Sequence, residues 1–326
     1  MTSQFVPSPS VDSYTQPMDV GIPLIDSNDS DSNHVTQPNL STTVTKIVSK
    51  NVHPRPDPPF FQTPAPKPKQ TSLFDRLFPL SQVKRVEFYQ ALLSEYIATL
   101  ILVLVATSTG LPVASTGVPD VHGALASGLI VATIVVGFGH VSGAHINPAV
   151  TVTFLVANEI DFYRALLYIG MQLLGAVSAS ALVKTITPMH AQNSLGMTMI
   201  TQDVSLTQAF IVEFFITFIL CYTVHAICDK HRDDVGGSKA LAVGFAVTVG
   251  CLFGGPYTGA SMNPARSFGP AAIMGSWKNH WIYWFGPLAG SIVAGLIYTR
   301  VLKRTPESAE LNKSRAHAKL DKENHI

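Results

Sequence analysis

The sequence contains two copies of the tripeptide Asn-Pro-Ala, which could together form a binding site. The first copy is Asn147-Pro148-Ala149, and the second, Asn263-Pro264-Ala265, begins 116 residues later. Proline suits the first turn of a helix, and asparagine is a good residue to cap it. Two such helix N-termini carry partial positive charge and amide N–H donors. A site built from them would bind the oxygen of a neutral molecule and repel cations.

The two boxes lie in matching surroundings. The segment 142–149 reads SGAHINPA, and the segment 258–265 reads TGASMNPA. Glu95 recurs as Glu213 at nearly the same offset. An inverted repeat whose broken helices meet at mid-membrane has this signature. The alternative, in which Asn-Pro marks an ordinary turn, does not account for two copies in matched contexts.

Three charged residues lie within apolar surroundings. Arg266 follows the second box in an otherwise charge-free stretch. A charge at membrane depth is costly, so we expect Arg266 to line a pore, the alternative being a side chain that reaches back to the interface. Glu95 and Glu213 would either relay protons or accept hydrogen bonds from the backbone of the two loops. Their symmetric repetition favours the second, structural role.

Long apolar segments must hold the two boxes and the three charged residues in place. Six are long enough to cross a bilayer as helices, and two that begin at the boxes, near 147–157 and 263–274, are too short and predict half-helices. The six expected spans are 87–109, 122–140, 162–184, 207–228, 238–255 and 280–302. Eight glycines on these spans predict close helix crossings: Gly110, Gly128, Gly170, Gly175, Gly244, Gly286, Gly290 and Gly295. The fold class is therefore an all-α membrane protein with six transmembrane helices and two re-entrant half-helices.

Composition excludes several classes of protein. Of the 326 residues, 47% are apolar and 13% charged, where soluble domains carry about a quarter charged residues. Residues 81–302 hold only 20 of the 43 charged side chains. A soluble globule and a nucleic-acid binder do not fit. The three cysteines form no metal or disulfide pattern, and with no nucleophile–base pair in view we expect neither an enzyme nor a cofactor.

The chain divides into a core between two tails. Residues 1–80 hold 13 of the 22 prolines and predict a disordered tail, while 303–326 predicts a short polar one. The channel core, 81–302, consists of two inverted halves, about 85–185 and 205–302. Lysine and arginine cluster on the side that holds both tails, which predicts cytoplasmic termini. We expect the plasma membrane rather than an internal membrane, although no targeting motif separates the two.

On its boxes, their spacing and Arg266, the core resembles the major intrinsic protein family, the aquaporins. The resemblance covers residues 85–302. It implies a right-handed bundle of six tilted helices and two half-helices, a homotetramer in lipid, and one pore in each subunit. It also implies passive transport without a cofactor. Ser267, Ala271 and the pair Tyr283-Trp284 resemble the water-selective branch of the family rather than the glycerol branch.

The selectivity filter of the family falls on four positions located from the boxes. They are Ser127, Cys251, Ala260 and Arg266. Water channels usually carry Phe at the first of these positions and His at the second. Replacing both rings by Ser127 and Cys251 predicts a wider and less polar filter. His140 and His145 precede the first box. One of them could line the vestibule or have a purely structural role, and the sequence favours neither alternative.

The leading functional expectation is a channel for water and small neutral solutes such as glycerol, urea or hydrogen peroxide, which excludes protons and ions. One alternative is a channel mainly for glycerol or other polyols, which Ser127 and Cys251 favour and Ser267 opposes. A second alternative is a junction or adhesion scaffold with a closed pore. Both box asparagines and Arg266 argue against a closed pore.

Overall fold

The computed structural model describes residues 82–113, 120–232, 236–303 and 314, and within them the chain is helical. The expected N-terminal tail, 1–80, and nearly all of the C-terminal tail, 303–326, lie outside these ranges. Six helices are long and apolar enough to cross a membrane. They are α3 (Val86–Ser108), α4 (Asp120–Ser142), α6 (Phe162–Ile186), α7 (Leu206–Cys228), α8 (Lys239–Thr258) and α10 (Ile282–Ile297), which continues as the π-helix η4 (Tyr298–Leu302).

Two short helices, α5 (Pro148–Val156) and α9 (Pro264–Met274), begin at the two boxes. Three single turns, η2 (Gln82–Lys84), η3 (Met189–Ala191) and η4, complete the described elements. The predicted six spans and two half-helices are thus confirmed. The boundaries differ by a few residues: α8 runs on to Thr258, and α10 begins at Ile282.

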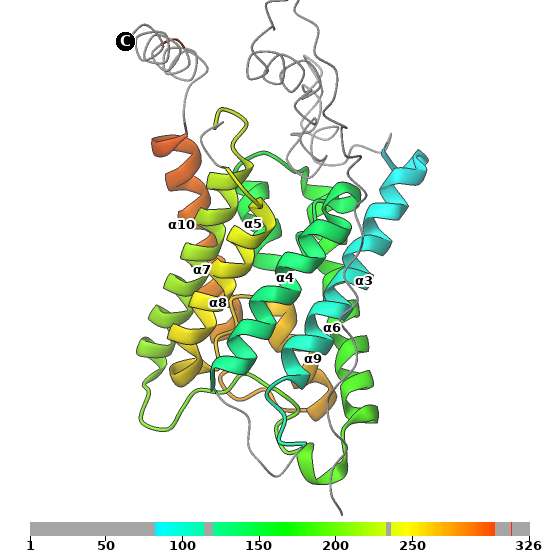
Figure 1. Cartoon of the computed structure of the whole chain (residues 1–326), viewed down its shortest axis with the longest axis vertical. Coiled ribbons are helices and arrows are strands. Elements are labelled where there is room, and N and C mark those ends of the chain that lie inside the picture. The colour runs from blue at the N-terminus through cyan, green and yellow to red at the C-terminus, as the bar shows by residue number, and fades with distance from the viewer. Residues whose placement is uncertain (1–81, 114–119, 233–235, 304–313, 315–326) are drawn as a thin grey trace, which may run out of the picture. The chain divides into compact units, whose positions relative to one another are not determined.

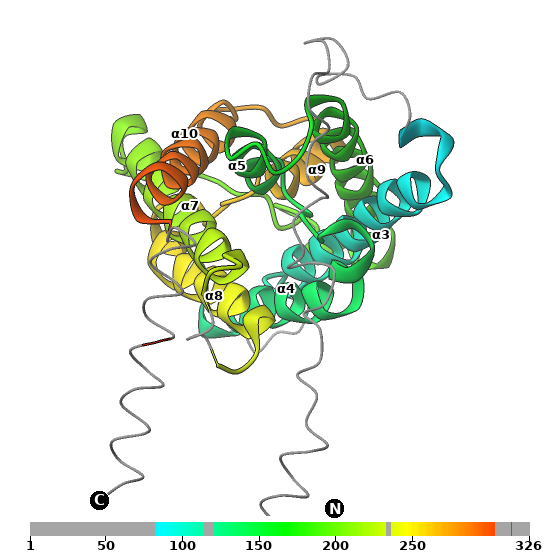
Figure 2. The same ribbon diagram turned by 90° about the horizontal axis from the view of Figure 1, so that it is seen from above.

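The helix contacts repeat between the two halves of the chain. Helix α3 packs against α4 and α6, just as α7 packs against α8 and α10. Helix α5 lies against α10, and α9 lies against α6, so each half-helix docks on the opposite half. Figure 2 shows the long helices around α5 and α9. In Figure 1 α5 lies toward one end of the bundle and α9 toward the other.

We call the end of the bundle where α3 begins and η4 ends the terminal face, and the end where α3 finishes and α7 begins the loop face (Figure 1). Short polar side chains start the helices at both faces. Asp161 caps α6, Ser205 forms a capping box with Gln208 on α7, and Ser238 caps α8. Each cap satisfies a backbone N–H that the helix itself leaves without a partner.

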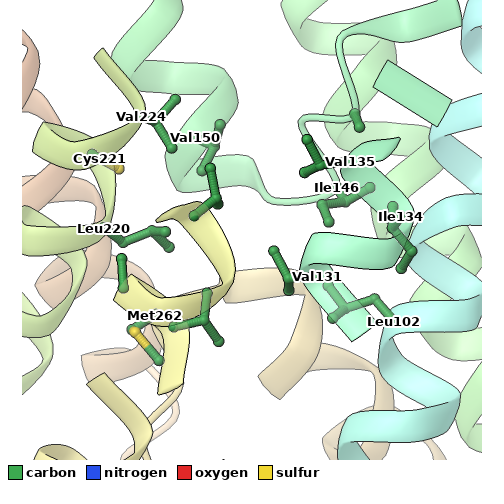
Figure 3. Packing of buried hydrophobic residues seen from close by; sticks show 14 of the residues in the cluster. Leu102, Val131, Ile134, Val135, Ile146, Val150, Leu220, Cys221, Val224 and Met262 are labelled. Carbon is green, nitrogen blue, oxygen red and sulfur yellow. The ribbon is translucent and has the colours of Figure 1, made fainter. Parts of the chain in front are cut away.

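The main apolar core joins α3, α4, α7 and α8 to the loops before both half-helices. Figure 3 shows Leu102 and Val131 on one side of it and Leu220 and Val224 on the other. The outward faces carry many exposed large apolar side chains, such as Phe245 at 60%. In water such a surface would be unfavourable, whereas in a bilayer it faces lipid. The protein is therefore an integral multi-pass membrane protein.

Most of the predicted glycine crossings occur, but two do not. A Cβ on Gly244 of α8 would lie 2.6 Å from the carbonyl oxygen of Gly128 on α4, and one on Gly175 of α6 would lie 2.5 Å from that of Tyr96 on α3. Gly286, Gly290 and Gly295 are equally close to neighbouring segments. A Cβ on Gly110 or Gly170 would meet nothing within 4 Å, so the expectation was wrong for them. Glycine spacing alone does not tell which helix face meets a neighbour.

The α4–α8 crossing gives a stability test. Gly128→Val should separate the two helices and cost ~2 kcal/mol or more, since a close crossing cannot absorb a branched side chain. Gly137→Val on the same helix meets open space and should behave as wild type. Thermal unfolding of both variants in detergent, followed by size-exclusion chromatography, measures the difference. Equal melting temperatures for the two variants would contradict the close crossing.

Candidate functional site

The loops before the two half-helices share one unusual backbone path. In the first loop Gly143, Ala144 and Ile146 have φ of 89°, 46° and 47°. In the second loop the corresponding residues, Gly259, Ala260 and Met262, have φ of 76°, 48° and 53°. Alanine and a larger apolar residue are disfavoured in this left-handed region. Each loop therefore holds two strained residues, and other contacts must hold them there.

A buried carboxylate holds each loop. Glu95 Oε1 accepts from the Ser142 hydroxyl (2.7 Å) and the His145 N–H (2.9 Å), while Oε2 accepts from the Ile146 N–H (2.7 Å) and the Gln172 amide (2.8 Å). Glu95 and its counterpart Glu213 are both fully buried.

Glu213 holds the second loop in the same way. Its carboxylate accepts from the Thr258 hydroxyl (2.6 Å) and from the N–H groups of Ser261 (2.9 Å) and Met262 (3.0 Å). With every carboxylate oxygen accepting bonds from the loops, the geometry favours the structural role over a proton relay.

The two box asparagines cap the half-helices and also tie the loops together. Asn147 Oδ1 accepts from the Ala149 N–H at 2.8 Å, and Asn263 Oδ1 accepts from the Ala265 N–H at 2.9 Å. Asn147 Nδ2 donates to the Met262 carbonyl (2.8 Å), and Asn263 Nδ2 donates to the Ile146 carbonyl (2.9 Å). One N–H of each side-chain amide is therefore bound to the opposite loop. Each keeps one N–H for a molecule beside it.

A cavity of about 240 Å³ runs past both asparagines. Its lining includes the four filter candidates, which come from α4, α8, the second loop and the start of α9. They are Ser127, Cys251, Ala260 and Arg266. The box prolines and alanines, Pro148, Ala149, Pro264 and Ala265, are buried in the first turns of the half-helices instead. The structure thus brings the asparagines and the four filter candidates to one cavity.

Arg266 lines this cavity in the first turn of α9. Its Nη1 donates to the Gly196 carbonyl, 2.7 Å away, in the segment between η3 and α7. Gly196 has a φ of 67°, and a Cβ there would lie 2.5 Å from the Thr107 carbonyl oxygen. Only glycine fits such a backbone. The geometry matches the expectation of a pore-lining arginine and not that of a side chain reaching to the interface.

Several lining residues were not singled out from the sequence. Leu102, Val131, Val135, Val150, Leu220, Val224, Val243 and Val247 form apolar walls, and Thr109, Gly110 and Gly123 also line the cavity. On α4 the lining residues Ser127, Val131 and Val135 are four positions apart, and on α8 the same spacing joins Val243, Val247 and Cys251. That spacing is a signal which could have identified both walls. Of the two histidines left open, His145 lines the cavity and His140 is exposed.

Ser267, which resembles the water-selective branch, is buried beside the cavity and does not line it. Its hydroxyl lies 2.6 Å from the Ser261 hydroxyl and 2.7 Å from the Thr198 hydroxyl. Ser261 in turn donates to the Asn263 carbonyl. These hydroxyl groups hold the second loop on the side that faces away from the cavity.

The carboxylates should control stability. Glu95→Gln replaces one acceptor oxygen by an N–H₂ group that faces other donors. Each buried donor left without an acceptor costs ~1–3 kcal/mol, so we expect a clear fall in melting temperature in detergent. Glu87→Gln, at an exposed site on the same helix, is the matched control. A Glu95→Gln protein that melts as wild type would contradict the role given to this carboxylate.

Comparison with known proteins shows the family of this chain. The family model for the major intrinsic protein family matches residues 82–298. Aquaporin-4 of Homo sapiens is 45% identical over 218 residues, which are 66% of this chain and 68% of that protein. The lens fiber major intrinsic protein of Lithobates pipiens is 43% identical over 223 residues, 68% of this chain and 84% of that protein.

Among solved structures, the aquaglyceroporin of Plasmodium falciparum matches with a TM-score of 0.61 and 23% identity. The match covers 69% of this chain and 99% of that one. At this identity the match supports the fold alone. The family model and the sequence relatives go further: the chain belongs to the major intrinsic protein family, the aquaporins, which are membrane channels and not enzymes.

Proposed function

We propose that this protein is a passive channel that conducts water, together with small neutral solutes, through the cavity between the two half-helices. The observation that carries the proposal is the lining of that cavity. Two asparagine amides and Arg266 supply donors, while the walls are apolar and two filter positions hold the small side chains Ser127 and Cys251. A neutral molecule with an oxygen acceptor fits such a lining.

The same lining opposes cations and protons. The N-termini of α5 and α9 begin at Asn147 and Asn263, which both line the cavity. Their partial positive charges meet there, and Arg266 adds a full one. An oxygen that accepts from both asparagine amides is oriented so that it cannot pass a proton along a water chain. The carboxylates of Glu95 and Glu213 accept hydrogen bonds from the loops and offer no proton path.

The size of the filter bears on which solutes pass. Ser127 and Cys251 both line the cavity, and their side chains are smaller than the two rings that water channels usually carry at these positions. A wider, less polar constriction favours three-carbon polyols, urea and hydrogen peroxide beside water. A channel mainly for glycerol or other polyols is the second candidate. The same two side chains favour it.

The orientation of the protein in the membrane follows from the distribution of its lysine and arginine residues. Arg164, Lys230 and Arg300 lie toward the terminal face, and basic residues concentrate on the cytoplasmic side of membrane proteins. The terminal face, and with it both tails, would then be cytoplasmic. We further propose a homotetramer in the plasma membrane, with lipid around it, in keeping with the family.

Osmotic measurements on vesicles test the proposal. Purified protein in liposomes is exposed to a sucrose step and then to a glycerol step, and light scattering follows the volume. Water efflux well above that of empty liposomes, followed by rapid re-swelling in glycerol, is the expected result. Water movement without glycerol entry would restrict the channel to water. No movement of either would contradict conduction.

The filter residues give a more specific prediction. Cys251→His places a ring and a polar donor in the constriction, so glycerol permeability should fall at least about five-fold while water permeability changes less than two-fold. Cys251→Ser keeps the size of the side chain and should leave both permeabilities near wild type. Equal losses of water and glycerol in Cys251→His would show that this position does not control solute size.

Cys251 also predicts sensitivity to mercury. Its side chain lines the cavity, whereas Cys221 is fully buried in the core. A mercurial on the Cys251 thiolate would fill the constriction, and water permeability should fall toward that of empty liposomes and recover with a reducing thiol. Cys251→Ser protein should not respond. Persistent inhibition in that variant would place the reactive thiol elsewhere.

A further inference from the structure

A second group of titratable side chains lies away from the cavity, at the terminal face. Glu159 follows α5, His225 is in the last turn of α7, and Lys303 follows η4. Lys303 Nζ lies 3.3 Å from Glu159 Oε1, and His225 Nδ1 lies 3.9 Å from Glu159 Oε2. The His225 side chain is 2% exposed and that of Glu159 is 19% exposed. These groups join the segment after α5 to α7 and to the end of η4.

The hydroxyl of Thr153 decides where His225 carries its proton. Thr153 Oγ1 lies 2.8 Å from the Ser291 carbonyl oxygen and 2.9 Å from His225 Nε2. A hydroxyl has one proton, and a carbonyl oxygen can only accept. Two acceptors at 2.8 Å would repel, so Thr153 donates to Ser291. His225 must then carry its proton on Nε2 and donate it to Thr153.

This assignment leaves an acceptor facing an acceptor. With Nε2 protonated, His225 Nδ1 presents a lone pair to Glu159 Oε2, and at 3.9 Å the two atoms are too far apart for a hydrogen bond. One added proton on Glu159 would turn this contact into a hydrogen bond to Nδ1. Burial raises the pKa of the Glu159 carboxyl above its ordinary value, and Lys303 opposes that rise.

Other charged groups face the pair. Asp229 favours proton binding by Glu159, whereas Lys230 acts against it. Asp229 accepts a hydrogen bond from the Tyr298 hydroxyl at 2.9 Å, and the Tyr298 ring stacks on His225 with 5.9 Å between centroids. His145, in the loop before α5, interacts electrostatically with His225 and with Arg164 in the first turn of α6.

Aromatic contacts connect this pair to the cavity. The Phe154 ring on α5 lies 5.2 Å from that of His225 and stacks on that of His145 at 4.7 Å. His145 and Asn147 both line the cavity. A displacement of the last turn of α5 toward α7 would therefore reach the lining through Phe154 and His145.

We propose that Glu159 and His225 form a proton-binding site, in which protonated Glu159 donates a hydrogen bond from Oε2 to His225 Nδ1. This bond draws the end of α5 toward α7 and thereby changes the permeability of the cavity. This inference rests on the proposed conduction of water but not on the proposed range of solutes.

Water permeability measured between about pH 8 and about pH 5 tests the proposal. Wild-type vesicles should show one transition with an at least two-fold change in permeability. Glu159→Gln should show, at every pH, the value that wild type reaches in acid, because its amide N–H donates to Nδ1 permanently. Glu87→Gln, an exposed site on α3, should keep the wild-type transition.

Two further variants test the parts of the argument. Lys303→Met removes the charge that keeps Glu159 ionised, so its transition should move to higher pH. Thr153→Val frees His225 to carry its proton on Nδ1, which can then donate to Glu159 without an added proton, so the transition should disappear. A Thr153→Val protein with the full wild-type transition would contradict the tautomer assigned to His225.

The outcomes separate this site from the channel function. Water permeability above that of empty liposomes but unchanged with pH, or a full wild-type transition in Glu159→Gln, would overturn the proposed site alone. No water permeability at any pH would contradict the proposed function. In that case infrared difference spectra still decide the site: the protonated carboxyl stretch that appears on acidification of wild type must contain a component that Glu159→Gln lacks, and identical difference spectra for the two proteins would overturn the proposal.

Discussion

The arrangement of the whole channel depends on two buried carboxylates that hold two strained loops. Without Glu95 and Glu213 the N–H groups of the loops would have no acceptors in an environment that offers little water. The cost of burying each carboxylate is offset only because each accepts several hydrogen bonds. Once the loops are fixed, the asparagine amides tie one loop to the other, and both half-helices point their N-termini at one cavity. Donor groups are thus in place before any solute arrives.

The internal repeat gives the two halves of the channel the same local structure. Equivalent helix contacts, equivalent loop backbones and equivalent caps recur in the two halves. Function arises where the halves differ. Arg266 has no charged counterpart in the first box, and so it adds a full positive charge to the cavity lining on the side of α9 only. In the first half Glu159 follows the corresponding half-helix and lies beside His225 and Lys303, which gives that end of the protein a titratable contact.

The sequence predicts the fold well because the constraints of a bilayer are visible in it. Apolar length gives six spans, the two Asn-Pro-Ala boxes give the half-helices, and the repeat gives their opposed orientation. It fails where a property depends on which face of a helix meets a neighbour. Gly110 and Gly170 were predicted at crossings and are not, and the apolar walls formed by residues such as Val131 and Val247 went unnoticed. The bonds from each asparagine to the opposite loop join residues more than a hundred positions apart, and no local pattern reveals them.

We propose that the cavity conducts neutral molecules but not protons. The positive potential at its midpoint repels protons, and the carboxylates of Glu95 and Glu213 are bound to the loops and cannot relay them. The most direct test measures water and proton movement in the same vesicles, with an osmotic step and a pH gradient applied to protein-containing and empty liposomes. We expect water permeability far above that of empty liposomes and a proton leak equal to theirs. Proton movement that rises together with water permeability would contradict it.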